Sequence, residues 1–139
     1  MVYLTEFGEP ETNMLRVVVA EAFAVGVARE IPDTGLLGRE IVVTPQSRHF
    51  ELLWESYVAY SVRNESFAEF DKDRPPSKSK FTERSASAYL RFVAETTFAN
   101  AVVGSVLKGP LRHWEITCAD HFLDVVSTVP PTVRMINPS

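Results

Sequence analysis

The chain has 139 residues, 45% of them hydrophobic, and a formal net charge of −4, which is the composition of one globular domain with a buried core. No apolar run approaches the ~18 residues of a membrane-spanning helix, and an acidic chain without a basic stripe is a poor binder of nucleic acid. Cys118 is the one cysteine, which excludes an intramolecular disulfide and a multi-cysteine zinc site. The acidic first residues lack the basic region of a signal peptide, so we expect a cytoplasmic protein.

The first long apolar segment, residues 14–31, has two interpretations. Its apolar side chains recur at helical spacing, and Pro32 would end a helix there. The β-branched run at residues 17–19 and the glycine at position 26 lower the helix propensity. We therefore predict a helix over residues 14–31, with two short strands split near Gly26 as the alternative.

The next segments predict a hairpin. Residues 31–38 are rich in turn-forming residues, residues 39–44 are a strand candidate, and residues 45–48 have the composition of a turn. The return strand would be residues 50–63. If this segment is a strand, six of its seven even-numbered residues, which share one face, are apolar. If it is a helix, five of the six residues on one face are apolar. The β-branched and aromatic residues favour the strand.

The remaining segments predict a loop, a helix and three strands. Residues 71–80 contain two adjacent prolines and mixed charges, which indicates a mobile, solvated loop. Residues 82–103 carry an apolar stripe at helical spacing, with Thr82 or Ser85 as the N-cap. Residues 111–119 and 122–129 then form two strands, and residues 133–136 a last edge strand.

Together these elements predict a single α+β domain over residues 1–139. Its antiparallel sheet would be built from residues 39–44, 50–63, 111–119 and 122–129. The helix at 82–103, and a second at 14–31, would pack on one face of that sheet.

One group of residues has the chemistry of a catalytic or metal site. Within a dozen positions the chain carries imidazole, carboxylate and thiol groups at His113, Glu115, Cys118, His121 and Asp124. In a strand, the first two of these side chains would share a face, and the thiol would point to the opposite face as core filling. The spacing matches no metal signature, so we predict no metal site and favour a structural role for the group. A Cys–His nucleophilic pair is a weaker alternative, because no glycine-rich elbow or oxyanion-hole motif is nearby.

The polar end of the 50–63 strand is the second candidate. There Tyr60 precedes the run Arg63, Asn64, Glu65 and Ser66. The guanidinium of Arg63 could clamp a carboxylate or a phosphate, and an exposed aromatic beside an arginine is typical of a protein-binding hot spot. The favoured interpretation is a polar turn in which Asn64 and Ser66 bond backbone groups.

The sequence leaves three classes of function open. No phosphate loop, dinucleotide fingerprint, paired-histidine helix or GxSxG elbow occurs, and we predict no cofactor. The favoured class is a non-enzymatic binding protein, acidic, that forms a homodimer or engages another protein. The alternatives are a small cofactor-independent or metal-dependent enzyme with a cleft lined by His113, Glu115, His121 and Arg63, and a carrier of a small apolar ligand. The enzyme requires the side chains of His113, His121 and Asp124 to converge.

Overall fold

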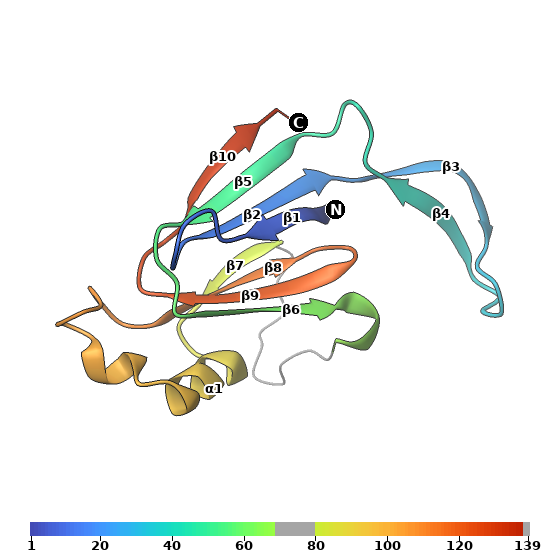
Figure 1. The fold of residues 1–139 in the computed structure, drawn as a ribbon. Coiled ribbons are helices and arrows are strands. Elements are labelled where there is room, and N and C mark those ends of the chain that lie inside the picture. Colours follow the sequence, from blue (N-terminus) through green and yellow to red (C-terminus); the bar gives the residue numbers. More distant parts are fainter. Residues whose placement is uncertain (69–79, 138–139) are drawn as a thin grey trace.

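The computed structural model describes residues 1–68 and 80–137 (Figure 1), which form ten strands, one α-helix and two short 3-10 helices. The strands are β1 (Val2–Gly8), β2 (Leu15–Glu21), β3 (Phe23–Glu30), β4 (Leu37–Val42), β5 (His49–Trp54), β6 (Ala59–Asn64), β7 (Phe81–Arg84), β8 (Arg112–Thr117), β9 (His121–Ser127) and β10 (Thr132–Ile136). The helices are η1 (Glu65–Phe67), α1 (Ala88–Thr96) and η2 (Ala99–Val102).

The strands form two four-stranded antiparallel sheets and one separate hairpin. The first sheet has the strand order β1-β2-β5-β10 and the second has the order β6-β9-β8-β7. The two sheets lie one over the other, and β3 and β4 pair only with each other, beside them (Figure 1). We call this hairpin, residues 23–42, the arm.

The main core lies between the two sheets. Alternate residues of β2 and β5 meet alternate residues of β8 and β9, as in sandwiches of antiparallel sheets. Trp54 of β5 and Trp114 of β8 pack edge to face, with ring centroids 6.1 Å apart. Such aromatic pairs add about 0.5–1.5 kcal/mol to the stabilisation from their buried area.

A smaller buried cluster lies on the outer face of the second sheet. Val93 of α1 and Val126 of β9 belong to it, together with Ala99 and Leu111. Helix α1 begins where the Ser87 side chain accepts a hydrogen bond from the Leu90 amide, so the N-cap is neither Thr82 nor Ser85. Within the described residues, no helix is long and apolar enough to span a membrane.

The predicted helix at 14–31 is wrong, because these residues form β2 and β3, divided at Ala22 rather than near Gly26. Val17 and Val19 face the core, while Val18, on the other face of β2, is also buried at 2% exposure. A central strand that is buried on both faces does not alternate in hydropathy. Its continuous apolar run is therefore compatible with helical spacing.

The predicted hairpin of 39–44 with 50–63 is also wrong. β4 pairs with β3, whereas β5 pairs with β2 and β10. The preference for strand over helix in residues 50–63 is confirmed, but the segment breaks at residues 55–58 and passes from the first sheet to the second. The Ser127 hydroxyl donates to the Ser56 carbonyl at this crossing.

The C-terminal half agrees more closely with prediction. Residues 111–119 and 122–129 contain the adjacent strands β8 and β9, and residues 133–136 lie in the edge strand β10. The helix predicted over 82–103 is shorter, because its start is the strand β7 and its end is η2. The predicted loop at 71–80 lies, apart from Lys80, outside the described residues. The described chain is thus mostly antiparallel sheet with one α-helix.

Candidate functional site

A group of polar side chains, all buried except that of Arg63, lies on the outer face of the second sheet, at the start of α1. We call it the polar cluster, and its members are Arg63, Arg84, Ser87, His113, Glu115 and Asp124. In β8, Trp114 and Ile116 point into the main core, so the alternate residues of this strand point outward. Asp124 of β9 is the cross-strand partner of Glu115. Strand pairing therefore brings together three of the predicted site residues, His113, Glu115 and Asp124.

His113 is the centre of this cluster and is only 1% exposed. Its Nε2 lies 2.8 Å from Asp124 Oδ1, and its Nδ1 lies 2.7 Å from Ser87 Oγ. Because Ser87 Oγ already accepts from the Leu90 amide, its hydroxyl proton is free to be donated to Nδ1. From this network we assign Nε2 as the donor to the Asp124 carboxylate and Nδ1 as the acceptor from Ser87.

The charges of the cluster balance within it. Arg63 Nη2 lies 3.1 Å from the second carboxylate oxygen of Asp124, and Arg84 Nη1 lies 3.5 Å from Glu115 Oε1. Two carboxylates thus face two guanidinium groups around the imidazole of His113. Ion pairing of this kind is what makes buried charges tolerable in an apolar surrounding.

The same groups have the spacing of a metal site but not its chemistry. One ligand atom each of His113, Glu115 and Asp124 lies within 4.8 Å of the others. However, the imidazole is bonded on both nitrogens and each carboxylate faces an arginine. A divalent ion would have to displace these partners and would leave the guanidinium groups beside it, so the residues do not fit a metal.

The series Ser87, His113, Asp124 contains the residue types of a hydrolytic triad. In such a triad the serine bonds Nε2 and the aspartate bonds Nδ1, which is the reverse of the arrangement here. Ser87 is only 1% exposed, and its oxygen caps α1. The Tyr89 ring meets the His113 ring edge-on, with ring centroids 5.3 Å apart, and its partial burial raises the pKa of its hydroxyl. These contacts join the start of α1 to β8 and β9.

The other two candidates in the His/Cys group lie elsewhere. His121, at the start of β9, pairs with Asn64, and its Nδ1 lies 3.0 Å from an Asp120 oxygen. Cys118 belongs to the main core, where burial raises the pKa of its thiol to about 12. The structure therefore brings His113 and Asp124 together without His121.

The predicted binding run at the end of β6 is divided in the structure. Arg63 joins the polar cluster and also lies over the Phe122 ring, 5.9 Å from its centroid. The Asn64 side chain accepts a hydrogen bond from the Ser66 amide at 2.9 Å and caps η1. Glu65 is exposed, and Tyr60 packs half-buried against the main core.

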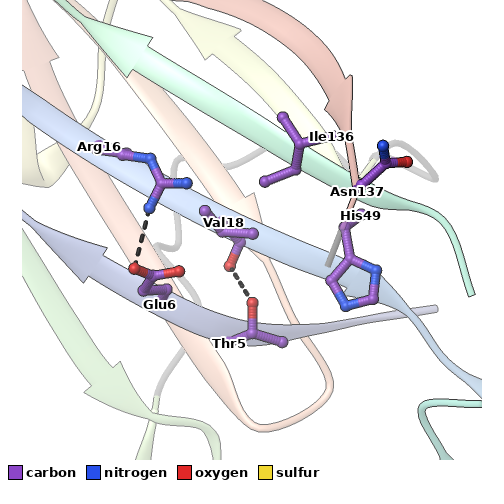
Figure 2. A pocket seen from close by; sticks show the side chains of 7 residues that line it. All are labelled: Thr5, Glu6, Arg16, Val18, His49, Ile136 and Asn137. Atoms are coloured by element: carbon purple, nitrogen blue, oxygen red, sulfur yellow. Dashed lines mark hydrogen bonds and ion pairs between the residues drawn. The ribbon is translucent and has the colours of Figure 1, made fainter. Parts of the chain in front are cut away.

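The outer face of the first sheet carries a polar pocket of about 280 Å³ (Figure 2), lined by Thr5, Glu6, Arg16, Val18, His49, Ile136 and Asn137. Arg16 lies between Glu6, 3.0 Å away, and the buried Glu51, 2.7 Å away. Arg134 and Arg16 both donate to Glu51 and hold the pKa of its carboxyl below the usual range. The arginine of this pocket is thus already neutralised by two carboxylates and is a weak anion binder.

The arm is the most exposed part of the fold. It extends away from both sheets (Figure 1). Val27, Ile31, Leu36 and Leu37 on it are 80%, 45%, 63% and 73% exposed. A two-stranded hairpin in water is at best marginally stable by itself, and exposed apolar patches commonly mark interaction sites. The arm therefore exposes apolar side chains that neither sheet covers.

The base of the arm is held firmly to the first sheet. Glu21, at the end of β2, and Arg48, before β5, form a bidentate ion pair with N–O distances of 2.6 and 2.9 Å. The Tyr3 hydroxyl donates to the Ile41 carbonyl, and the Ala22 amide donates to the Met1 carbonyl. These bonds fix the direction in which the arm leaves the sandwich.

Comparisons with protein-family models, with curated proteins and with solved structures find no match for this chain. The arguments about its function therefore come from its own residues.

Sequence reasoning missed the arm and two members of the polar cluster. For the arm the sequence predicts the end of a helix, a turn-rich loop and a strand over residues 39–44, and only this last element agrees with β4. A usable signal was the adjacent pair Leu36 and Leu37, because two leucines between glycines are unusual in a solvated loop. Ser87 could have been found from its position three residues before Leu90, at the start of the apolar stripe.

Proposed function

We propose that this chain is a non-enzymatic, cytoplasmic interaction protein that self-associates through its arm. The observation that carries this proposal is the separation of the β3–β4 hairpin from both sheets, with apolar side chains exposed along it. The clasp between Glu21 and Arg48 supports it, because a hairpin held rigidly at its base loses little conformational freedom on binding.

The free energy of association favours a partner whose own surface also buries apolar area in the contact. Fully burying a large aliphatic side chain gains about 1.5–3 kcal/mol, so the four exposed aliphatic residues of the arm, which are 45–80% exposed, offer at most roughly 6–12 kcal/mol. Association costs an estimated 4–15 kcal/mol in lost freedom. The arm on a featureless surface would give a weak complex, whereas an apolar surface on the partner would give a stable one.

The polar cluster supports a structural role better than a catalytic one. Ser87 and His113 are each 1% exposed, and Asp124 is 4% exposed, so a substrate has no route to them. Each of these groups is already hydrogen-bonded. We infer that the cluster anchors α1, as a cover, on the outer face of the second sheet.

Light scattering coupled to gel filtration tests the proposal. The wild-type chain should have a mass above that of the 15.6 kDa monomer at micromolar concentrations. Leu37→Asp should return it to the monomer. Val106→Asp is the matched control, because Val106 lies outside the arm and is 74% exposed, against 73% for Leu37. A monomeric wild type, or equal dissociation by both variants, would overturn the proposal.

A further inference from the structure

An apolar cleft opens between the two sheets where β10 lies opposite β7. Its volume is about 240 Å³, and its lining is Val2, Val19, Phe50, Leu52, Lys80, Phe81, Ile116 and Val133. Val133 and Met135 of β10 are the cross-strand partners of Leu52 and Phe50, whose side chains face the core. Yet Val133 and Met135 are 54% and 65% exposed. Within residues 1–68 and 80–137, the inner face of the first sheet is therefore only partly covered along β10.

We infer that this cleft receives the arm of a second copy of the chain. The inference rests on the proposed self-association and names the surface that the arm contacts. Each copy supplies one arm and one cleft, so every contact joins the arm of one copy to the cleft of another. Such contacts close into a dimer or a ring, or continue as a filament, according to the rotation between copies.

The size of the cleft favours a small apolar insert. Sites that enclose a drug-sized ligand have volumes of about 300–1,000 Å³, so this cleft is below that range. Leu36, just before β4, and Leu37, its first residue, have exposed apolar side chains small enough for such a space. Their burial would also cover Val133 and Phe81 of the cleft, which are 54% and 37% exposed, and this adds to the apolar area removed from water.

Charge complementarity points to the same pairing. Lys80 lies at the cleft, whose other lining residues are all apolar. The loop end of the arm, residues 29–38, carries the acidic residues Glu30 and Asp33 and the basic residue Arg29, and is therefore net acidic. An arm that enters the cleft by its loop end would place opposite charges beside each other, which guides the orientation of the contact.

The arm of the same chain points away from the cleft, so an arm that fills the cleft belongs to a second copy. In Figure 1 the arm leaves the sandwich beyond the ends of β2 and β5, and its loop end lies apart from both β7 and β10. Within one chain the arm therefore leaves the cleft uncovered.

Disulfide trapping between two variants tests the contact. A tagged Leu36→Cys chain is mixed with an untagged Met135→Cys chain and oxidised, and the covalent product is measured by mass. The native Cys118 does not compete, because it is 3% exposed and its thiol has a pKa raised to about 12. We expect a covalent heterodimer, at least fivefold more abundant than with Val106→Cys as the second chain.

The outcomes separate this inference from the proposed function. If the wild type is oligomeric but Leu36→Cys joins Val106→Cys as readily as Met135→Cys, the arm contacts another surface and the cleft assignment is overturned. If the wild type is a monomer, both the assignment and the proposed self-association fail.

A fluorescent apolar dye, anilinonaphthalene sulfonate, tests for a small-molecule occupant. If the arm fills the cleft, the monomeric Leu37→Asp variant should bind the dye at least threefold more strongly than the wild-type oligomer. Equal binding by both would show that the cleft stays open in the assembly, which overturns the inference and favours a small apolar ligand.

Discussion

Glu21 and Arg48 face each other across the base of the arm and form the best-connected ion pair there. The Arg48 guanidinium donates to both oxygens of the Glu21 carboxylate, and the backbone amide of Arg48 donates to one of them as well. In the reverse direction, the Glu21 amide donates to the Arg48 carbonyl. Side-chain and backbone hydrogen bonds thus both join the end of β2 to the residue just before β5.

This pair predicts an unusually acidic carboxyl group. The side-chain hydrogen bonds from Arg48 lower the pKa of Glu21 to about 2, from an ordinary value of 4.5. Because the folded pKa is the lower one, the stabilisation from this pair is present above about pH 4.5 and is lost as the pH falls towards 2. Carbon-13 titration of the Glu21 carboxyl should give an apparent pKa near 2.

Arg48→Ala should return the Glu21 titration towards 4.5, with faster hydrogen exchange at the amides of the arm. Glu95→Gln, on the exposed side of α1, should leave both measurements unchanged. A wild-type Glu21 that titrates above pH 4 would show that the clasp does not persist in solution.

Ser87→Ala should destabilise the protein by about 2 kcal/mol. The substitution removes the N-cap of α1, which contributes about 1 kcal/mol, and leaves His113 Nδ1 buried without its donor. Thermal unfolding should show a fall in Tm of several degrees. Ser85→Ala is the control, because Ser85 is exposed two positions earlier, and its Tm should shift by less than a third as much.

Asp124→Asn should cost about 2–3 kcal/mol in the free energy of unfolding. Breaking a fully buried ion pair typically costs 3–5 kcal/mol, but the Arg63 side chain is 46% exposed and can regain water. Urea unfolding measures the loss. Asp33→Asn, in the exposed turn of the arm, should have an effect within about 0.5 kcal/mol. Equal, small effects from both substitutions would argue against the polar cluster as an anchor.

Cys118 should resist thiol reagents in the folded protein. Its side chain is buried in the main core and its pKa is raised to about 12, so at pH 8 almost none of it is the reactive thiolate. Labelling by a disulfide reagent should occur only at the rate of unfolding and become complete in urea. Rapid labelling under native conditions would contradict the burial.

The antiparallel strands of the C-terminal half could be predicted from the sequence because their apolar and polar residues alternate. In β8, Trp114 and Ile116 face the core while His113 and Glu115 face outward, and that periodicity is visible in the sequence. The same pattern placed His113 and Glu115 on one face correctly. Their partners Ser87 and Arg84 could not be inferred from periodicity, because strand pairing and the N-cap of α1 bring them there.

The first half was harder because its local pattern is governed by distant contacts. β2 is buried on both faces, so Val17, Val18 and Val19 carry no alternation that would distinguish strand from helix. The turn at residues 45–48 is present, with the Ser47 amide donating to the Thr44 carbonyl. It does not form a hairpin, because the strand that follows pairs with β2 and β10 instead of β4. No local signal specifies that choice.

The position of β10 in the first sheet has a consequence for how the chain folds. β5 pairs with β10 across a long stretch of chain: the Glu51–Arg134 ion pair joins residues 83 positions apart. Contacts between residues so distant in sequence cost a large loop-closure entropy before they contribute any stabilisation. This cost slows folding. Until β10 docks, β5 is an open edge with hydrophobic side chains beside it, so the chain passes through a stage prone to aggregation.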